Sequence, residues 1–421
     1  MNHLIAYLKE KAGRHKTLIG NFSYLSALQI FNLILPLVTY PYLIRVLGKE
    51  LYGLVVFAQA TVGYMRIAVE FGFNISATKS VSVHRDDPDK LSEAVSSVLI
   101  LKTILFLLSF AVLLLLFLFI PQIRAYKLLF ILTMWVCLYE VIFPSWYFQG
   151  IEKMKYITWI TLISRLISLV LIFMLIRSPG DYLLFPVISG IGAVVAGCIS
   201  LYIIFGTGNI TFLFTPAAVL KRYFTESVPI FVSNLSVQLY LSTSKILVGI
   251  FLGLSGVAYY DLGEKILNLL KTPVVIFTQV IFPKMSNRYD FAFLKKTAAI
   301  LFVSVLAAIV LFQLTAEELI ILFAGRDMLP AANVARILTL SLLPLIVSNA
   351  LGIQTLLSQG FNREYSAVVL HGTLSYFVFV AVLLFTSTFT IYTISYVSVL
   401  IELVMLAEFY LRCKKLQLIH S

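Results

Sequence analysis

Charged side chains occur inside the long apolar stretches of this sequence. The bases among them are Arg66, Lys102, Arg165, Lys245, Lys265 and Lys271. The acids in or beside the same stretches are Glu70, Glu140, Asp261, Glu264 and Glu402. In membrane helices such charges usually face a bundle interior or a watery cavity, where they bind ligands or relay protons. The pattern therefore predicts a polar cavity that handles charged groups.

Polar residues in four apolar stretches recur at helical spacing, so each set lies on one face of a helix. The sets are Gln29, Asn32, Pro36 and Thr39; Gln59, Gly63, Arg66 and Glu70; Asn234, Gln238, Ser242 and Lys245; and Asp261, Glu264, Lys265, Asn268 and Lys271. Two sets come from each half of the chain. We expect these four helices to line a cleft between the halves.

A structural role is the alternative for the same residues. Amides and hydroxyls in membrane helices often only hold helices together, and long basic side chains can extend to the membrane surface. Arg66 with Glu70, and Asp261 with Lys265, have the i, i+4 spacing of local ion pairs. Arg45 could contact a lipid headgroup or a ligand.

Four further charged residues have separate interpretations. Lys102 and Arg165 lie nearer to the ends of their apolar stretches and are expected to extend to the membrane surface. Glu140 is alone in its stretch, and an uncompensated buried carboxylate favours its neutral form. Glu140 is therefore a candidate proton carrier, and Glu402 is a weaker one.

The composition places the chain in a lipid bilayer. Of its 421 residues, 60% are hydrophobic and 12% charged, with a mean hydropathy of +0.97, whereas soluble proteins carry about 25% charged residues. Stretches of roughly 20 apolar residues can each cross the hydrocarbon core. Twelve spans are predicted, near residues 18–42, 51–71, 96–119, 126–149, 157–176, 182–205, 226–251, 257–282, 297–315, 332–357, 365–386 and 389–411. The predicted fold class is an all-α polytopic membrane protein with about 12 transmembrane helices.

The positions of lysine and arginine predict the orientation of the chain. Of 32 such residues, 19 lie outside the spans on one side, seven on the other side and six within the spans. Loops rich in these residues stay in the cytoplasm. Both chain ends are therefore expected to be cytoplasmic.

A weak internal repeat divides the sequence. A shift of 205 residues places Gln29 on Asn234, Arg66 on Lys271, and the glycine of a predicted hinge, Gly48, on Gly253. We expect two six-helix bundles, over residues 1–210 and 211–421, related by an axis along the membrane normal.

Motifs of known catalytic sites are absent from the sequence. It contains no Walker A, HExxH, GxSxG or CxxC pattern, and its five histidines are dispersed. Asp86, Asp87 and Asp89 could hold a metal, but a solvated turn before a helix that begins at Ser92 explains them better. We therefore expect no enzyme activity, cofactor or metal, and transport energised by an ion gradient, the membrane potential or the substrate gradient.

Three segments carry a resemblance to a known family: LPLVTYPYLIRVLGKELYGLVVFAQA (35–60), FGFNISATKSVSVHRDD (71–87) and PSWYFQGIEKMKYIT (144–158). They resemble the polysaccharide flippases of the Wzx type, in the multidrug/oligosaccharidyl-lipid/polysaccharide exporter superfamily. The resemblance implies a V-shaped pair of bundles with alternating access. It also implies movement of an undecaprenyl-diphosphate-linked oligosaccharide, such as an O-antigen unit, from the cytoplasmic to the periplasmic leaflet of the bacterial inner membrane. A polysaccharide polymerase and a chain-length regulator are candidate partners.

The resemblance also assigns roles to the polar residues. A diphosphate that crosses a low-dielectric layer needs countercharge, which lysine and arginine supply as charge-assisted donors. The expected substrate-binding residues are Arg66, Lys245, Lys265, Lys271, Arg45, Gln29, Asn32, Asn234, Gln238 and Asn268. The expected ion-coupling residues are Glu70, Asp261, Glu264 and Glu140.

Two other classes of function remain as alternatives. One is a cation-coupled multidrug or metabolite exporter of the same superfamily, whose cationic ligands would favour an acidic cavity. The stripes of the second, third and fourth sets carry four bases and three acids, which favours the flippase by a narrow margin. The other is a membrane enzyme such as a polymerase, which is disfavoured because the predicted outward loops are short.

Overall fold

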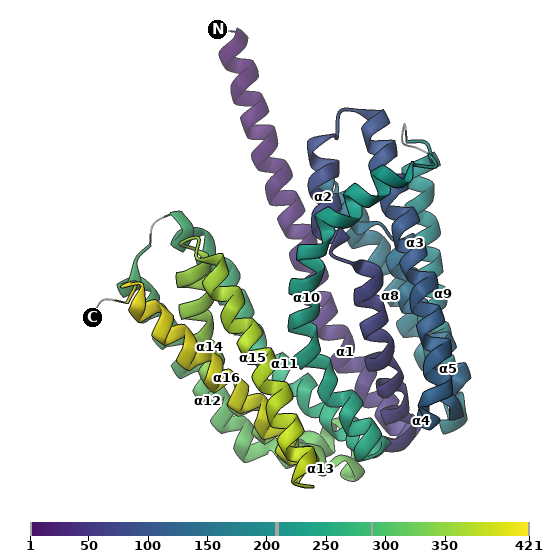
Figure 1. The fold of residues 1–421 in the computed structure, drawn as a ribbon, viewed down its shortest axis with the longest axis vertical. Helices are drawn as coiled ribbons and strands as arrows, with labels where there is room; N and C mark the ends of the chain where they lie inside the picture. Colours follow the sequence, from purple (N-terminus) through teal and green to yellow (C-terminus); the bar gives the residue numbers. More distant parts are fainter. Residues whose placement is uncertain (1, 207–209, 288, 420–421) are drawn as a thin grey trace. The chain divides into compact units, whose positions relative to one another are not determined.

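The chain is helical in every part that the structure describes. The computed structural model describes residues 2–206, 210–287 and 289–419, and its elements in these ranges are all helices (Figure 1). Within them, ten stretches are long and apolar enough to cross a membrane. The structure thus confirms the all-α, multi-pass class.

The described part of the chain has ten candidate spans, whereas twelve were predicted. Two regions of the chain account for the difference in number. The predicted spans 18–42 and 51–71 lie in one element, α1 (Asn2–Glu70), which contributes to a single candidate. The predicted span 226–251 lies in α10 (Ala217–Phe251), of which only Ser242–Phe251 forms an apolar helical stretch in the described part. The predicted spans 18–42 and 226–251 both include side chains outside the described part, so the number of twelve spans stays a prediction.

The chain forms two compact units. Unit 1 comprises Met1–Leu47 and Thr61–Asn234, and unit 2 comprises Gly48–Ala60 and Leu235–Ser421. A short segment of α1 therefore belongs to unit 2 although both flanking segments belong to unit 1. The predicted boundary at residue 210 separates the two copies of the internal repeat, which is a different property from these compact units. That boundary stays a prediction.

The predicted hinge at Gly48 is confirmed as a break within α1. Gly48 has φ 72° and ψ 167°, a combination that only glycine adopts without strain. Its partner in the predicted repeat, Gly253, also has a positive φ, of 86°. Both glycines interrupt helix at the point where the sequence comparison aligned them.

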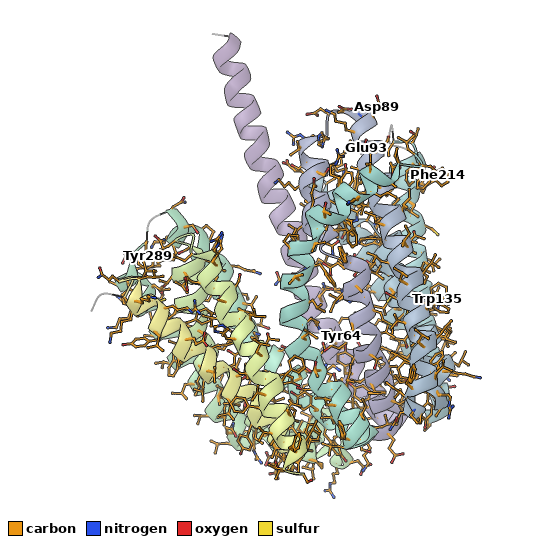
Figure 2. The ribbon with its side chains drawn as sticks, viewed as in Figure 1. Tyr64, Asp89, Glu93, Trp135, Phe214 and Tyr289 are labelled. Atoms are coloured by element: carbon orange, nitrogen blue, oxygen red, sulfur yellow. The ribbon has the colours of Figure 1, made fainter. Side chains whose placement is uncertain are left out.

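Unit 1 contains the helices that follow α1 as far as the start of α10. They are α2 (Phe73–Val83), α3 (Pro88–Phe119), α4 (Pro121–Ala125), α5 (Lys127–Thr133), α6 (Trp135–Ile142), α7 (Ser145–Gly150), α8 (Met154–Leu175), η1 (Pro179–Leu183), α9 (Leu184–Leu201) and η2 (Tyr202–Gly206). The predicted span 126–149 is thus divided among α5, α6 and α7. Small residues allow close packing here: a Cβ on Gly190 would lie 2.5 Å from the ring of Trp135, which is labelled in Figure 2.

One predicted helix start in unit 1 is wrong. The helix expected to begin at Ser92 begins four residues earlier, at Pro88. Asp87 is the N-cap, and its carboxylate accepts a hydrogen bond of 3.1 Å from the backbone N–H of Lys90. Proline suits the first helical position because its missing N–H would have no partner there. The Asp-Pro pair, rather than the serine, therefore sets the helix start.

Unit 2 contains the end of α10 and all later helices. They are α11 (Leu254–Asn287), α12 (Phe291–Ala324), η3 (Arg326–Met328), α13 (Pro330–Leu340), α14 (Leu342–Leu351), η4 (Gly352–Leu357), α15 (Asn362–Phe385) and α16 (Ile391–Lys415). The α1 segment Gly48–Ala60 packs into this unit through small residues. The ring of Phe57 lies on Gly249, where a Cβ would be only 2.4 Å away.

Candidate functional site

Two charge clusters lie on apolar helical stretches, one cluster in each unit. The N-terminal charge cluster, in unit 1, consists of Arg66, Lys102 and Glu140. The C-terminal charge cluster, in unit 2, consists of Tyr52, Lys245, Asp261, Glu264 and Lys265. Together they include six of the charged residues expected to bind substrate or couple ions.

The N-terminal charge cluster is centred on Glu140, on α6. Nη1 of Arg66 lies 3.1 Å from Oε1 of Glu140. Nζ of Lys102, on α3, donates a hydrogen bond of 3.0 Å to the backbone carbonyl of Glu140 and lies 3.8 Å from its Oε2. Glu70 acts electrostatically on the same group of charges. Arg66, Lys102, Glu140 and Glu70 together carry no net charge when all four are ionised.

Three expectations for this region are corrected by the structure. Glu140 is not alone, because two bases from other helices contact it. Lys102 does not extend to the membrane surface, because its side chain is 0% exposed. The ion pair of Arg66 is with Glu140, 74 residues away, and not with Glu70 at i+4. These partners lie on different helices, and residue spacing along one helix does not predict contacts between helices.

The C-terminal charge cluster is centred on Asp261, on α11. Nζ of Lys245, on α10, bridges Oδ1 of Asp261 at 3.1 Å and Oε2 of Glu264 at 2.8 Å. Nζ of Lys265 pairs with Oδ2 of Asp261. This confirms the predicted i, i+4 pair of Asp261 and Lys265.

Tyr52 completes the C-terminal charge cluster from the α1 segment of unit 2. Its hydroxyl donates a hydrogen bond of 2.6 Å to Oδ2 of Asp261 and accepts one of 2.6 Å from Nζ of Lys265. Sequence analysis missed Tyr52, since a tyrosine in an apolar stretch gives no periodic signal. The one feature of the sequence that could have indicated Tyr52 is its position in the segment that follows the predicted hinge at Gly48.

The side chains of this cluster differ in how much of their surface is exposed. The side chain of Asp261 is 4% exposed, whereas those of Lys245, Glu264 and Lys265 are 20%, 21% and 22% exposed. The two ammonium groups can therefore meet a ligand while the aspartate stays buried. Because two bases and two acids cancel, an anion binds strongly only when an acid is displaced or takes up a proton.

The remaining expected site residues lie outside both clusters. Oδ1 of Asn32 accepts a hydrogen bond from Nη1 of Arg165, so that base has a partner on α1. Gln238 donates to Ser242 on the same helix. The others are exposed or half-buried: Gln29, Arg45, Asn234, Asn268 and Lys271. For the uncharged residues with partners, these contacts fit the role of holding helices together.

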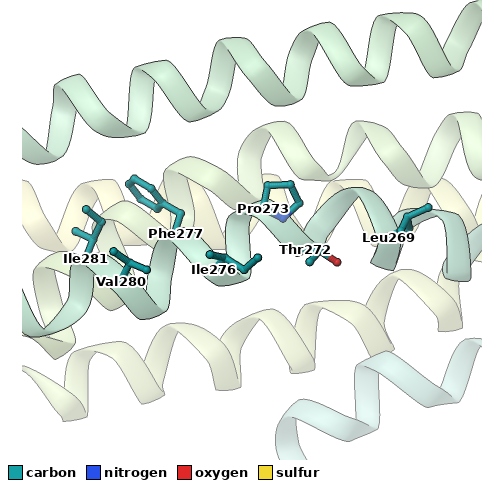
Figure 3. A pocket seen from close by; sticks show the side chains of 7 residues that line it. All are labelled: Leu269, Thr272, Pro273, Ile276, Phe277, Val280 and Ile281. Atoms are coloured by element: carbon teal, nitrogen blue, oxygen red, sulfur yellow. The ribbon is translucent and has the colours of Figure 1, made fainter. Parts of the chain in front are cut away.

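An apolar groove of about 570 Å³ follows one face of α11 in unit 2 (Figure 3). Its lining residues are Leu269, Thr272, Pro273, Ile276, Phe277, Val280 and Ile281. The only side-chain polar atom among them is the hydroxyl of Thr272, which donates to the carbonyl of Asn268. The groove thus suits hydrocarbon rather than sugar or phosphate.

Comparisons with known proteins agree on a transporter fold. A family model described as "Polysaccharide biosynthesis protein" matches residues 18–288. An Escherichia coli K12 protein is 30% identical over 358 residues, which cover 83% of this chain and 86% of the relative. A Shigella dysenteriae protein is 26% identical over 270 residues, which cover 63% and 66%. Both relatives carry the name "Putative O-antigen transporter".

Solved structures of low sequence identity share the fold. The lipid II flippase MurJ, in an inward closed conformation, matches with a TM-score of 0.75 at 14% identity over 92% of this chain and 87% of that one. A multidrug resistance MATE family transporter of the MOP superfamily, in an inward-facing conformation, matches with 0.68 at 15% identity over 92% and 100%. At such identities the likeness establishes the architecture and leaves the substrate open.

Proposed function

Because the chain belongs to the polysaccharide biosynthesis protein family, we propose that it flips an undecaprenyl-diphosphate-linked oligosaccharide across the bacterial inner membrane. The direction is from the cytoplasmic to the periplasmic leaflet, by ion-coupled alternating access, with both chain ends in the cytoplasm. A polysaccharide polymerase and a chain-length regulator are its proposed partners. Both relatives are named "Putative O-antigen transporter", and these names support this class of substrate.

The observation that carries the proposal is the C-terminal charge cluster. Lys245, in the apolar stretch Ser242–Phe251, and Lys265, in the candidate span Leu254–Asn287, place two partly exposed ammonium groups on apolar helices of unit 2. Ammonium groups in a low-dielectric setting offset the charge of a passing diphosphate. Asp261 and Glu264 hold these ammonium groups in place while no ligand is bound.

The proposed binding step is an exchange of partners. The diphosphate approaches the two ammonium groups and replaces the carboxylate of Glu264, which is as exposed as the lysines. Asp261 is buried and keeps its hydrogen bond from Tyr52. Glu264 is then left without a basic partner. Proton uptake by the Glu264 carboxylate would remove the energetic cost of that unpaired charge. Substrate binding and proton uptake would be linked in this way.

Flipping by purified protein in proteoliposomes tests the proposal. The vesicles would contain a fluorescent polyprenyl-diphosphate oligosaccharide, and a membrane-impermeant quencher would report its leaflet, with and without a pH gradient. We expect protein-dependent flipping, and a loss of roughly tenfold or more in rate for the double variant Lys245→Gln/Lys265→Gln, since each lost charge-assisted contact is worth about 1.5–3 kcal/mol.

The matched control carries the same chemical change away from the cluster. Lys295→Gln/Lys296→Gln alters two exposed lysines in the first turns of α12 and should leave the rate unchanged. Equal rates for both double variants would exclude the cluster as the binding site. Absence of flipping, together with efflux of small organic cations from the same vesicles, would instead indicate the cation-coupled exporter.

A further inference from the structure

Glu402 is a buried acid that neither charge cluster includes. It lies near the middle of α16 (Ile391–Lys415) in unit 2. Its Oε2 is buried and has no hydrogen-bond partner within residues 2–206, 210–287 and 289–419. Glu140, Asp261 and Glu264 each have a basic partner within 4 Å. Three of the acids expected to couple ions thus have a basic partner, whereas Glu402, which is not in that expected set, has none within 4 Å in the described part of the chain.

The groups that surround Glu402 come from several helices. Lys271, on α11, and the phenol of Tyr365, on α15, interact electrostatically with Glu402. Arg336 on α13 is engaged by Glu317 of α12. Helix α14 (Leu342–Leu351) and η4 carry no titratable side chain. Farther along α16, Glu408 and Arg412 pair with His371 and Glu364 of α15.

Lys271 is the natural counterpart of Glu402. Its side chain is half-buried, and no hydrogen bond or ion pair of Lys271 is found in the described part of the chain. Helix α11 has 17 residues before Lys271 and 16 after it, so this base lies close to the middle of the helix. An ordinary phospholipid keeps its headgroup at the membrane surface, so an anion at this depth belongs to a molecule in transit.

A neutral carboxyl group fits the site of Glu402 better than an ionised one. An ionised carboxylate with an unsatisfied oxygen in an apolar setting is far more costly than a neutral carboxyl group. When Glu402 is ionised, the positive charge of Lys271 partly offsets it. When Glu402 is neutral, Lys271 is left as an uncompensated cation that can attract an anion. Proton occupancy at Glu402 and anion occupancy at Lys271 therefore favour each other.

We propose that Glu402 is a proton site of the transport cycle and that its proton controls whether Lys271 is available for the diphosphate. A proton from water forms an O–H bond with the Glu402 carboxylate as the anion binds at Lys271. The proton leaves to water when the anion departs. The second part of this proposal rests on the proposed flippase function, whereas the protonation of Glu402 does not.

Infrared difference spectroscopy of the reconstituted protein, titrated with pH and without substrate, tests the first part. We expect a band of a protonated carboxyl group that disappears as pH rises and is missing in Glu402→Gln. The control, Glu318→Gln, alters an exposed acid of α12 and should keep the band. If Glu402→Gln does not fold, Glu402→Asp should keep the band with a shifted titration. A band that persists in Glu402→Gln, or one that responds to Na⁺ and not to pH, would overturn the proton site.

Proton uptake during ligand binding tests the second part. Undecaprenyl diphosphate would be added to lightly buffered vesicles that contain a pH indicator. We expect proton uptake by the wild type and about half of that uptake for Glu402→Gln and for Lys271→Gln, because Glu264 remains as the second proton acceptor. Undiminished uptake in either variant would overturn the link to Lys271. Because the infrared titration uses no substrate, it stands even where flipping itself is absent.

Discussion

The hydroxyl of Tyr52 donates a hydrogen bond of 2.6 Å to Oδ2 of Asp261, a residue 209 positions later in the chain. Both belong to unit 2, although Tyr52 lies on the α1 segment whose flanks belong to unit 1. The bond thus ties the segment after the Gly48 break to the aspartate that holds two lysines. A buried carboxylate with several donors is well stabilised in its ionised form.

Removing this hydroxyl should destabilise unit 2. Tyr52→Phe keeps the ring but leaves Oδ2 of Asp261 with one donor fewer, and a hydrogen bond to a charged group contributes about 1.5–3 kcal/mol. We expect a loss of that size in the free energy of unfolding, measured by denaturant titration in detergent micelles. The matched control is Tyr410→Phe, at a tyrosine that is 50% exposed. An equal effect of the two substitutions would show that the hydrogen bond contributes nothing.

Lys102 should be among the most sensitive bases of unit 1. Lys102→Met removes a fully buried ammonium group and leaves Glu140 with fewer partners. Breaking a buried ion pair costs about 3–5 kcal/mol. Because Arg66 still contacts Glu140 at 3.1 Å, we expect the lower end of this range in unfolding measurements. Lys153→Met, at an exposed lysine, should change stability by less than about 0.5 kcal/mol, and a similar loss for both variants would argue against the cluster.

The N-cap of α3 should depend on pH. The backbone N–H of Lys90 lowers the pKa of Asp87 below its ordinary value of 3.8. A carboxyl group whose pKa is lowered by folding contributes stability above its unfolded pKa and loses that contribution as pH falls through its folded pKa. The protection of the first-turn amides of α3 against hydrogen exchange, taken relative to the intrinsic exchange rate at each pH, should therefore be higher at neutral pH than in acid. Asp87→Asn should remain a cap without this pH dependence, whereas retained dependence would assign it to another group.

Sequence periodicity predicted the polar faces because side-chain direction in a helix follows from spacing alone. Asp261 with Lys265 is a contact of this kind, and it is present. The Gly48 break was also predictable, since glycine before a second apolar stretch marks a change of backbone direction. The membrane class followed from composition and length.

Contacts between helices distant in sequence could not be predicted in this way. Arg66 reaches Glu140 across 74 residues, and Tyr52 reaches Asp261 across 209. Lys102 was expected at the membrane surface because it lies near the end of an apolar stretch, yet helix packing buries it. Such pairings depend on which helix faces are adjacent, and a single sequence carries no record of that adjacency.

Gly53 should tolerate no side chain, in contrast with a glycine ten residues later on the same helix. A Cβ on Gly53 would lie 1.9 Å from the backbone oxygen of Leu254, at the start of α11 in the same unit. Backbone cannot give way as a flexible side chain can, so Gly53→Ala must push α1 and α11 apart, and overpacking of this kind costs about 1–3 kcal/mol.

A Cβ on Gly63 would have no heavy atom of the described residues within 4 Å. Gly63→Ala should therefore stabilise the helix by about 0.5–1 kcal/mol, the difference in helix propensity between alanine and glycine. Unfolding in detergent measures both changes, and effects of the same sign would contradict the close approach of α1 and α11.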